Sequence, residues 1–488
     1  MKPSLKALLP GVFVLLTLPA AADSVLIRDV QVVSPHAPPS GEAVNVLIDD
    51  GVIRVIGPEA PPAGAVIDGS GRYLVPGLID THVHLQGVPG ESPEMPAAVR
   101  KQALEQIPRS YLYFGFTSVL DLFSADELVE QWNSQPLAPT AYHCAGVPIP
   151  GGYPLAALLP ESGQLQGPAA RFYQYDPRRQ ELMSATPGSE RHKPAALVSR
   201  IAATGARCIK TFYETGYGRL KGLPVPTPEM TRELVAAAHA QGLPVFMHGN
   251  SLAAYRFALD TGVDMLVHGL WHGVEAADTA TLARLADTLA ERGLRVQPTI
   301  GVIHGERELF DPAFFSRPGV RDALPDTLIR WYGSPAGQWM ARELAQGFGG
   351  VERIRAAIGA PLVTVQQFTR LLAERDAALV FGSDTPSGPI YTQFAGINGR
   401  WEIQRWAEQG VPPARLFRAV TLDNARLLGI EDLVGSVEVG KRADLLLLGE
   451  NPLASTGAYD SIEWVILAGQ PIERRALSAR APVTDELK

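Results

Sequence analysis

The fold can be inferred from one segment, Pro76-Gly77-Leu78-Ile79-Asp80-Thr81-His82-Val83-His84. Its apolar residues favour a buried β-strand, which ends in two histidines that are two positions apart. Residues two apart on a strand point to the same face, so both imidazoles can reach one metal ion. A single histidine at a strand end is more often a hydrogen-bonded core residue than a ligand. The pair therefore indicates a metal site at the end of this strand.

Apolar strand-like segments alternate with helical stretches through residues 73–425, which favours a parallel sheet built from βαβ units. We predict strands at 73–84, 116–122, 140–149, 207–214, 244–250, 265–270, 295–302 and 378–384. Eight such strands predict an α/β fold, a (β/α)8 TIM-like barrel, with long insertions after the third and seventh strands. An open doubly wound sheet is the alternative, but the sequence has no Gly-rich dinucleotide fingerprint to support it.

Both ends of the chain have short β-like segments, at 24–33 and 43–56 and again at 443–448 and 464–467. Asp50-Gly51 is a hairpin signal between two of them. We therefore predict a small β-sandwich domain formed from both termini. The predicted organisation is a signal peptide at 1–22, the two parts of the β-sandwich at 23–72 and 429–488, and the barrel at 73–428.

The first 22 residues are typical of a secretory signal peptide rather than of a buried helix. Lys2 and Lys6 give a positive start, an apolar run follows, and Ala20-Ala21-Ala22 offers a cleavage site. The apolar run is too short to span a bilayer, and no cysteine follows it. We expect an exported protein, periplasmic or secreted, without a membrane anchor.

The two cysteines, Cys144 and Cys208, lie on neighbouring predicted strands. One disulfide is conceivable in an oxidising compartment, but two buried thiols are favoured because strand interiors seldom offer the geometry of a bridge.

The composition limits the partners of this chain. Its 488 residues are 46% hydrophobic and 19% charged, with a formal net charge of −8 and no basic block. This excludes nucleic acid as the expected partner, since phosphate binding needs concentrated positive charge. A small-molecule substrate is expected, and a homo-oligomer is compatible with the sequence.

Further polar residues lie near the ends of other predicted strands. His248, His268 and Asp384 close apolar strands, and Lys210 lies within one. Catalytic groups of such barrels come from the C-terminal strand ends, so these residues form a pattern with His82 and His84. A lysine buried among apolar neighbours must be neutralised, paired or modified.

The segment 76–84 resembles the first-strand signature of the amidohydrolase superfamily, and the chain is similar to its imidazolonepropionase-like branch, which includes Xaa-Pro dipeptidases. The tail segment 440–445 and the helix with Thr421, Asn424, Ala425 and Gly429 match it too. One departure concerns mononuclear members, which carry a Glu shortly after the fifth-strand histidine. Here residues 249–252 have no carboxylate, which favours the dinuclear hydrolase form.

The resemblance implies a dinuclear site. His82 and His84 would bind one ion with Asp384, His248 and His268 would bind the second, and Lys210 would react with CO₂ to give a bridging carbamate. Zn²⁺ suits these ligands, although Mn²⁺, Fe²⁺ or Co²⁺ could also bind. A metal-bridging hydroxide would attack the scissile carbonyl, with Asp384 as the catalytic proton carrier.

The expected function is hydrolysis of an amide or peptide-like C–N bond in a small molecule. The alternatives are an esterase, lactonase or phosphotriesterase on the same dinuclear site, and a non-catalytic binding protein. Further residues are predicted to face the substrate, with an ordinary loop role as the alternative for each: His143, Tyr213, Tyr217, Arg219 and His272.

Overall fold

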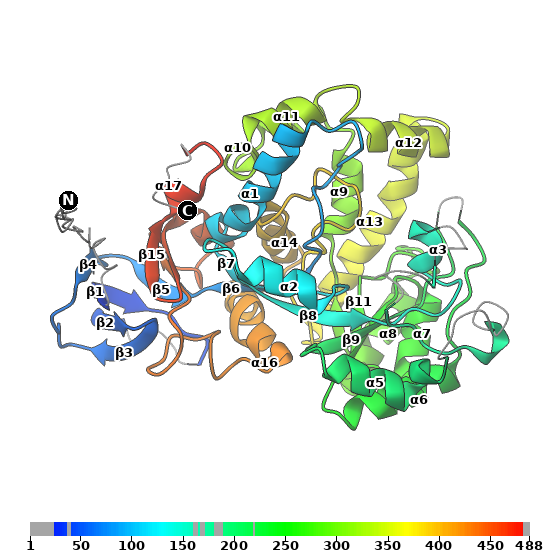
Figure 1. Ribbon diagram of the computed structural model, residues 1–488, viewed down its shortest axis with the longest axis horizontal. Helices are drawn as coiled ribbons and strands as arrows, with labels where there is room; N and C mark the ends of the chain where they lie inside the picture. Colours follow the sequence, from blue (N-terminus) through cyan, green and yellow to red (C-terminus); the bar gives the residue numbers. More distant parts are fainter. Residues whose placement is uncertain are drawn as a thin grey trace, which may run out of the picture.

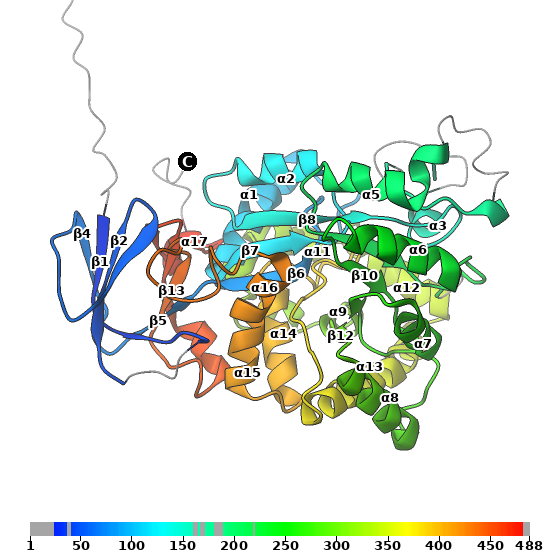
Figure 2. The same ribbon diagram turned by 90° about the horizontal axis from the view of Figure 1, so that it is seen from below.

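The computed structural model describes residues 24–36, 41–159, 164–165, 171–179, 189–217 and 220–481. The predicted signal peptide and Arg219 lie outside these described residues. The described chain forms two sheets, one of them surrounded by helices (Figure 1). The other sheet lies at one end of the molecule, where the first and last parts of the chain meet (Figure 2).

The helix-covered sheet is parallel and has seven strands within the described residues, in the order β12-β11-β10-β9-β8-β7-β6. Their bounds are β6 Leu78–Val83, β7 Phe116–Asp121, β8 Thr140–Gly146, β9 Cys208–Phe212, β10 Val245–His248, β11 Met265–Val267 and β12 Arg295–Gln297. Each of these strands lies within one of the first seven predicted ranges. The mixed α/β fold with a curled parallel sheet is therefore confirmed.

The eighth predicted strand, at 378–384, is not a regular strand. Single parallel bridges, Val296 with Leu379 and Val83 with Thr385, connect this segment to β12 on one side and to β6 on the other. Side chains occupy much of its backbone hydrogen-bonding capacity. The carbonyl of Phe381, for example, accepts hydrogen bonds from Thr81 Oγ1 at 2.6 Å and from Asn424 Nδ2 at 2.9 Å. The prediction of a strand here is wrong because side-chain donors replace part of the strand ladder.

The first predicted strand, 73–84, is divided between the two sheets. Tyr73–Pro76 forms β5 of the terminal sheet and β6 begins at Leu78, so the break falls at Gly77. A Cβ at Gly77 would lie 2.0 Å from Thr117 Oγ1, so only glycine fits where the chain passes from one sheet to the other.

Helices fill the connections between the parallel strands. Within the described residues they are α1 Ala97–Tyr113, α2 Asp126–Asn133, α3 Leu155–Leu158, α5 Pro194–Ala202, α6 Pro228–His239, α7 Leu252–Thr261, α8 Thr279–Arg292, α9 Gly301–Glu308, α10 Val320–Ala323, α11 Asp326–Tyr332, α12 Trp339–Phe348, α13 Val351–Glu374, α14 Ile397–Glu408, α15 Pro413–Arg418, α16 Asn424–Leu428 and α17 Arg474–Leu477. Helices α9 to α13 occupy the long insertion after the seventh strand. No helix among the described residues is both long enough and apolar enough to cross a bilayer.

The terminal sheet joins both ends of the chain. Its order is β15-β14-β13-β5-β1-β2-β3, with β4 paired to β1. The bounds are β1 Ser24–Val32, β2 Val44–Asp49, β3 Val52–Gly57, β4 Ala65–Asp68, β13 Leu445–Leu448, β14 Ile462–Leu467 and β15 Gln470–Glu473. The antiparallel pair β5–β13 is where N-terminal and C-terminal strands meet. Asp50 and Gly51 form the predicted hairpin between β2 and β3, both with positive φ.

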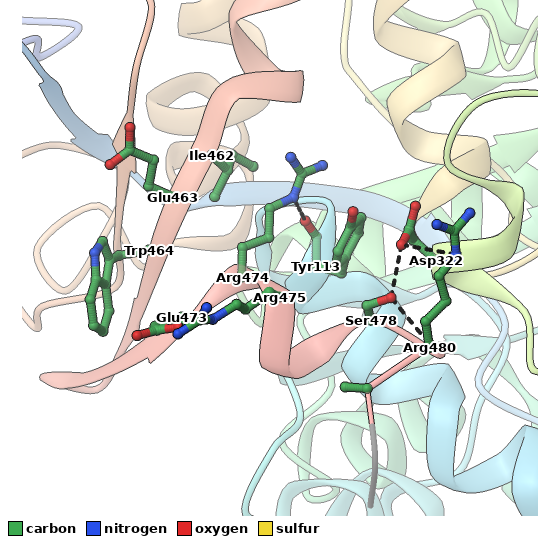
Figure 3. Close-up of a pocket in the computed structure, with 11 residues that line it drawn as sticks. Tyr113, Asp322, Ile462, Glu463, Trp464, Glu473, Arg474, Arg475, Ser478 and Arg480 are labelled. Carbon is green, nitrogen blue, oxygen red and sulfur yellow. Dashed lines mark hydrogen bonds and ion pairs between the residues drawn. The ribbon is translucent and has the colours of Figure 1, made fainter.

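The C-terminal segment, residues 474–481, contacts the neighbouring helices around a hollow of about 640 Å³ (Figure 3). Arg475 pairs with Glu473, and Arg480 Nε lies 3.7 Å from Asp322 Oδ1 in α10. The same oxygen accepts a hydrogen bond from Ser478 Oγ at 2.8 Å. These charges neutralise one another, so the hollow is a docking contact of the C-terminal segment.

Cys144 and Cys208 form a disulfide between β8 and β9. They lie directly opposite each other on these strands, with Cα atoms 4.6 Å apart, which is within the range that a disulfide bridges. The expectation of two buried thiols is therefore wrong, because strand register brings the two cysteines into bonding position.

Candidate metal centre

Three side chains converge where β6 ends. His82 Nε2 lies 3.0 Å from Asp384 Oδ1, and His84 Nε2 lies 3.2 Å from the same oxygen. One ligand atom from each residue lies within 4.8 Å of the other two. The side chains of His82 and Asp384 are buried, whereas that of His84 is 31% exposed and can be reached from solvent. The predicted pairing of two strand-end histidines with Asp384 is thus present in the structure.

The other three predicted ligands lie around the same cavity of about 510 Å³. His268 Nδ1 is 3.6 Å from Asp384 Oδ2, and the ring centroids of His248 and His268 are 4.6 Å apart. Lys210 lies on β9 and is 3% exposed. All six predicted ligands therefore line one cavity, but only His82, His84 and Asp384 already form a compact three-ligand group.

Two of these side chains lie on strained backbone. Asp384 has a φ of 53° and His268 a φ of 84°, in the left-handed region that residues other than glycine seldom adopt. Thr299, with a φ of 43°, contacts His268 Nδ1 through its Oγ1 at 3.0 Å. Such strain persists only where the surrounding structure fixes it, and it gathers at functional sites.

Buried hydrogen bonds hold the Asp384 segment against β6. Asp80 accepts hydrogen bonds from the backbone N–H groups of His82 at 3.1 Å and Ser383 at 3.0 Å. Asn424 Nδ2 donates to the carbonyls of Ile79 at 2.8 Å and Phe381 at 2.9 Å. These contacts set the position of the two chain segments that carry His82 and Asp384.

The electrostatics favour neutral imidazoles at most positions. Burial lowers the pKa of His82 to about 4, and it also lowers the pKa values of His248 and His268. Burial opposes charge on His84 as well, but hydrogen bonds to Asp121 and Asp384 outweigh it and raise the pKa of His84 to about 9. Burial alone would raise the pKa of Asp384, but the neighbouring histidines hold it well below its usual range.

Lys210 is a buried amine without a partner. Its Nζ has no hydrogen bond or salt bridge to any described residue, and burial lowers its pKa to about 7. A lysine left unpaired in such surroundings is one that gives up its proton readily. Its neutral amine is then available as a nucleophile.

These observations fit a divalent cation. The Nδ1 atom of His82 is buried without a hydrogen-bond partner among the described residues, while its Nε2 lies beside Asp384 Oδ1. The neighbouring histidines hold the pKa of Asp384 well below its usual range, and a carboxylate of this kind attracts a positive partner. Imidazole nitrogens and a carboxylate oxygen are ligands that Zn²⁺ and related ions prefer.

Within the described part of the chain, the predicted substrate residues do not line this cavity. His143 Nε2 contacts Thr204 Oγ1 at 3.2 Å, and Tyr213 packs against Phe257 with ring centroids 4.7 Å apart. Tyr217 is half exposed, and its ring lies 6.1 Å from that of Tyr153, a residue of the cavity wall. His272 forms a backbone bridge outside the cavity. Their roles stay predictions.

Other residues at the site were not anticipated from the sequence. Glu214 Oε2 lies 3.4 Å from His248 Nε2, and Asp121 Oδ1 lies 3.5 Å from His84 Nδ1. Asp121 is the last residue of β7, and Glu214 lies two residues after β9, at the end of the predicted strand 207–214. The remaining wall comes from residues without a motif: Gln86, Leu122, Phe123, Ser124, Ala125, Gly146, Tyr153, Pro154, Arg171, Phe172, Phe212, Pro386, Ser387 and Gly388.

Solved structures share this fold over most of the chain. A Xaa-Pro dipeptidase with bound methionine superimposes with a TM-score of 0.62 at 21% identity, covering 92% of this chain and 100% of its own. An ochratoxinase of A. niger gives 0.61 at 19%, covering 93% and 96%. Phenylurea hydrolase B gives 0.61 at 20%, covering 94% and 99%.

Sequence comparison gives the family. An S-triazine hydrolase of Gordonia rubripertincta is 38% identical over 50 residues, a match that spans only 10% of each chain. The model of the amidohydrolase family matches residues 185–472, more than half of the chain, and this range includes Lys210, His248, His268 and Asp384. The chain therefore belongs to the amidohydrolase family.

Proposed function

We propose that this chain is a metal-dependent hydrolase that cleaves an amide or peptide-like C–N bond of a small molecule. The observation that carries the proposal is the gathering of four histidines, Asp384 and the unpaired Lys210 around one cavity. The (β/α)8 barrel with a small terminal β-sandwich is the architecture that we infer for this site. Single bridges on both sides of the segment 378–385 support a closed barrel.

The residues divide into two ligand groups. His82, His84 and Asp384 would hold one ion, and His248 and His268 would hold the second. Lys210, once carboxylated by CO₂, would become an anionic oxygen ligand for both. Divalent ions in such a site supply Lewis acidity and lower the pKa of water.

Asp384 is the residue that moves the proton. Its Oδ1 faces His82 and His84, its Oδ2 lies 3.6 Å from His268, and the residue lines the cavity. We assign Oδ2 the role of taking the proton of the attacking water and delivering it to the leaving amine. The neighbouring histidines hold the pKa of Asp384 well below its usual range, which favours the ionised form of this carboxyl group.

The cavity wall favours an apolar group beside the scissile bond. Phe123, Tyr153, Phe172 and Phe212 all line it, and the Tyr153 ring lies 4.6 Å from that of His248. Aromatic walls bind apolar groups and exclude water around the reacting atoms. We therefore expect amides of hydrophobic acids or amines to be better substrates than small polar amides.

Export is a further part of the proposal, and it rests on residues 1–22 of the sequence. The mature chain should begin near Asp23, which N-terminal sequencing from the native host checks. An intact Met1 on active cytoplasmic protein would contradict it.

The experiment that tests the function is a substrate panel on zinc-loaded protein. N-acyl amino acids and dipeptides with hydrophobic side chains are compared with matched esters, lactones and a phosphotriester. We expect the highest kcat/KM on an amide. Turnover confined to esters, lactones or the phosphotriester would mean that the site cleaves another kind of bond. The absence of turnover with every compound would favour a binding protein.

A further inference from the structure

A groove of about 1270 Å³ adjoins the active-site cavity. It runs between the helices α1 and α2 and residues 171–173 and 191–200 of the insertion after β8. Gln86, Ala125 and Arg171 line both the groove and the cavity. A substrate held at the metal centre can therefore extend into the groove.

One side of the groove has a buried hydroxyl without a partner. Tyr173 is 1% exposed and lines the groove, and its Oη makes no hydrogen bond within the described part of the chain. The Tyr173 ring stacks on His192 with centroids 3.6 Å apart, and His192 Nδ1 lies 3.1 Å from the Tyr173 carbonyl oxygen. The Tyr173 ring is thus held in place while its Oη makes no hydrogen bond. A buried hydroxyl without a hydrogen bond destabilises the folded protein unless a ligand supplies the missing partner.

Two arginines beside this phenol have no carboxylate partner among the described residues. Arg200 donates to the carbonyl oxygens of Arg191 at 3.3 Å and Arg171 at 3.0 Å, and its guanidinium lies over the Phe172 ring at 5.0 Å. Arg191 is exposed and forms no ion pair with any described residue. The other two arginines of the groove differ, since Arg171 pairs with Asp126 and Glu127, and Arg100 pairs with Glu91.

The charges of Arg191 and Arg200 act on the same small region. Burial lowers the pKa of Arg200, and the like charges of Arg191 and Arg171 lower it further. Burial raises the pKa of Tyr173, and the two arginines oppose that rise. In a chain with a formal net charge of −8, this wall of Tyr173, Arg191 and Arg200 is a local concentration of positive charge and hydrogen-bond donors.

We propose that this arginine–tyrosine wall binds a carboxylate of the substrate, remote from the bond that is cleaved. The inference rests on the proposed amide hydrolysis and names its substrate class as amides that carry a second, anionic end. Guanidinium groups and a phenolic O–H donate charge-assisted hydrogen bonds to a carboxylate, and the buried Tyr173 hydroxyl gains the partner that it lacks.

The test uses a series of hydrophobic amides with an ω-carboxylate on chains of increasing length, each paired with its ω-carboxamide. The quantity compared is the ratio of kcat/KM for the acid to that for the carboxamide, on the metal-loaded enzyme. We expect the wild type to favour the acid at least about tenfold at the best length. Tyr173→Phe and Arg191→Gln should each reduce this ratio several-fold through KM, with kcat/KM for the carboxamide unchanged.

Arg256→Gln is the matched control, because Arg256 is an exposed arginine of α7 that does not line the groove. It should leave the ratio unchanged. Tyr173→Phe removes only a hydroxyl that makes no hydrogen bond here, so the fold is retained. An unchanged ratio in both Tyr173→Phe and Arg191→Gln, or an equal loss on both members of each pair, would overturn the proposal.

A second measurement keeps this proposal separate from the proposed function. Glutarate should raise the melting temperature of the wild type more than that of Tyr173→Phe. If the wild type hydrolyses no amide, the proposed function fails, and equal glutarate shifts in the two proteins would overturn the anion site as well. Inorganic phosphate that stabilises the wild type as strongly as glutarate, without any preference for acid substrates, would mean that the wall holds a free anion instead.

Discussion

Asp384 combines three properties that no other described residue of the cavity combines. It lies on left-handed backbone, it contacts three imidazoles, and these imidazoles hold the pKa of its buried carboxyl well below the usual range. Each property is costly by itself, and together they fix the position of this carboxylate in the cavity. The role of Asp384 can therefore be tested without changing the shape of the site.

Asp384→Asn should reduce kcat by at least about a hundredfold, the usual scale for the loss of a general base. The amide keeps one oxygen ligand and the shape of the side chain, so the fold and most of the metal should remain. Because the proton transfer stabilises the transition state, kcat/KM should fall with kcat. Asp376→Asn, at a carboxylate whose side chain is 93% exposed, is the control. Near wild-type turnover in metal-loaded Asp384→Asn would remove Asp384 as the base.

Lys210→Ala should lose both metal and activity. The buried amine has no structural partner among the described residues, so its removal breaks no hydrogen bond and leaves a small cavity. A short carboxylic acid added with metal should restore part of the activity by filling the place of the carbamate. Metal analysis and kinetics check this. Full activity with both ions bound in Lys210→Ala would contradict the assignment.

At the scale of elements, the segment 378–385 shows what the sequence alone could not predict. Its run of apolar residues predicts a strand, and the same kind of apolar run correctly predicts the first seven strands. Here, however, Thr81, Asn398 and Asn424 donate side-chain hydrogen bonds to the carbonyls of Phe381 and Ser383. Such long-range side-chain contacts leave no local pattern, so the strand was predicted where an irregular segment lies.

Asn424→Ala should destabilise the protein by about 2–3 kcal/mol, because it removes the donor of two buried hydrogen bonds to Ile79 and Phe381. It should also lower kcat, since those bonds set His82 against Asp384. Urea unfolding and kinetics on one preparation measure both effects. Asn451→Ala, at a partly exposed loop residue whose side chain accepts from the Leu453 N–H, should cost far less. Equal effects of the two substitutions would show that the hydrogen bonds of Asn424 do not hold these two segments together.

The disulfide between β8 and β9 should stabilise the folded chain by about 2–4 kcal/mol. The variant with both Cys144→Ala and Cys208→Ala, compared with the wild type in urea unfolding, measures this. The wild type in a reducing agent should move toward the variant. Two titratable thiols in the denatured, unreduced protein would show that the bridge does not form.

At the scale of the whole molecule, both ends of the chain are fastened to the catalytic part. β5 of the terminal sheet continues through Gly77 into β6, which carries His82, and the C-terminal segment docks on α10 through Asp322. The β-strands near the two ends of the chain were predictable from short apolar segments and a hairpin signal. The pairing partners were not, because strand register depends on contacts between residues hundreds of positions apart.

The gathering of the six proposed ligands around one cavity was predictable, because strand ends impose a simple rule on where polar residues meet. The groove was not predictable from the sequence. The insertion after β8 forms one side of it, and Tyr173 and Arg200 in this insertion belong to no motif. Among the predicted substrate residues, His143 lies in a predicted strand, and the others follow Lys210 or His268 in the sequence. In the structure, His143 and Tyr213 contact neighbouring residues outside the cavity instead.

Metal reconstitution tests the central claim, hydrolysis by a metal centre at His82, His84, Lys210, His248, His268 and Asp384, most directly. The chelated protein is titrated with Zn²⁺ while metal content and turnover of the best amide are followed together. Turnover should be absent without metal and should reach its maximum as two ions bind per chain. Full turnover by protein that has been stripped of its metal would contradict the account.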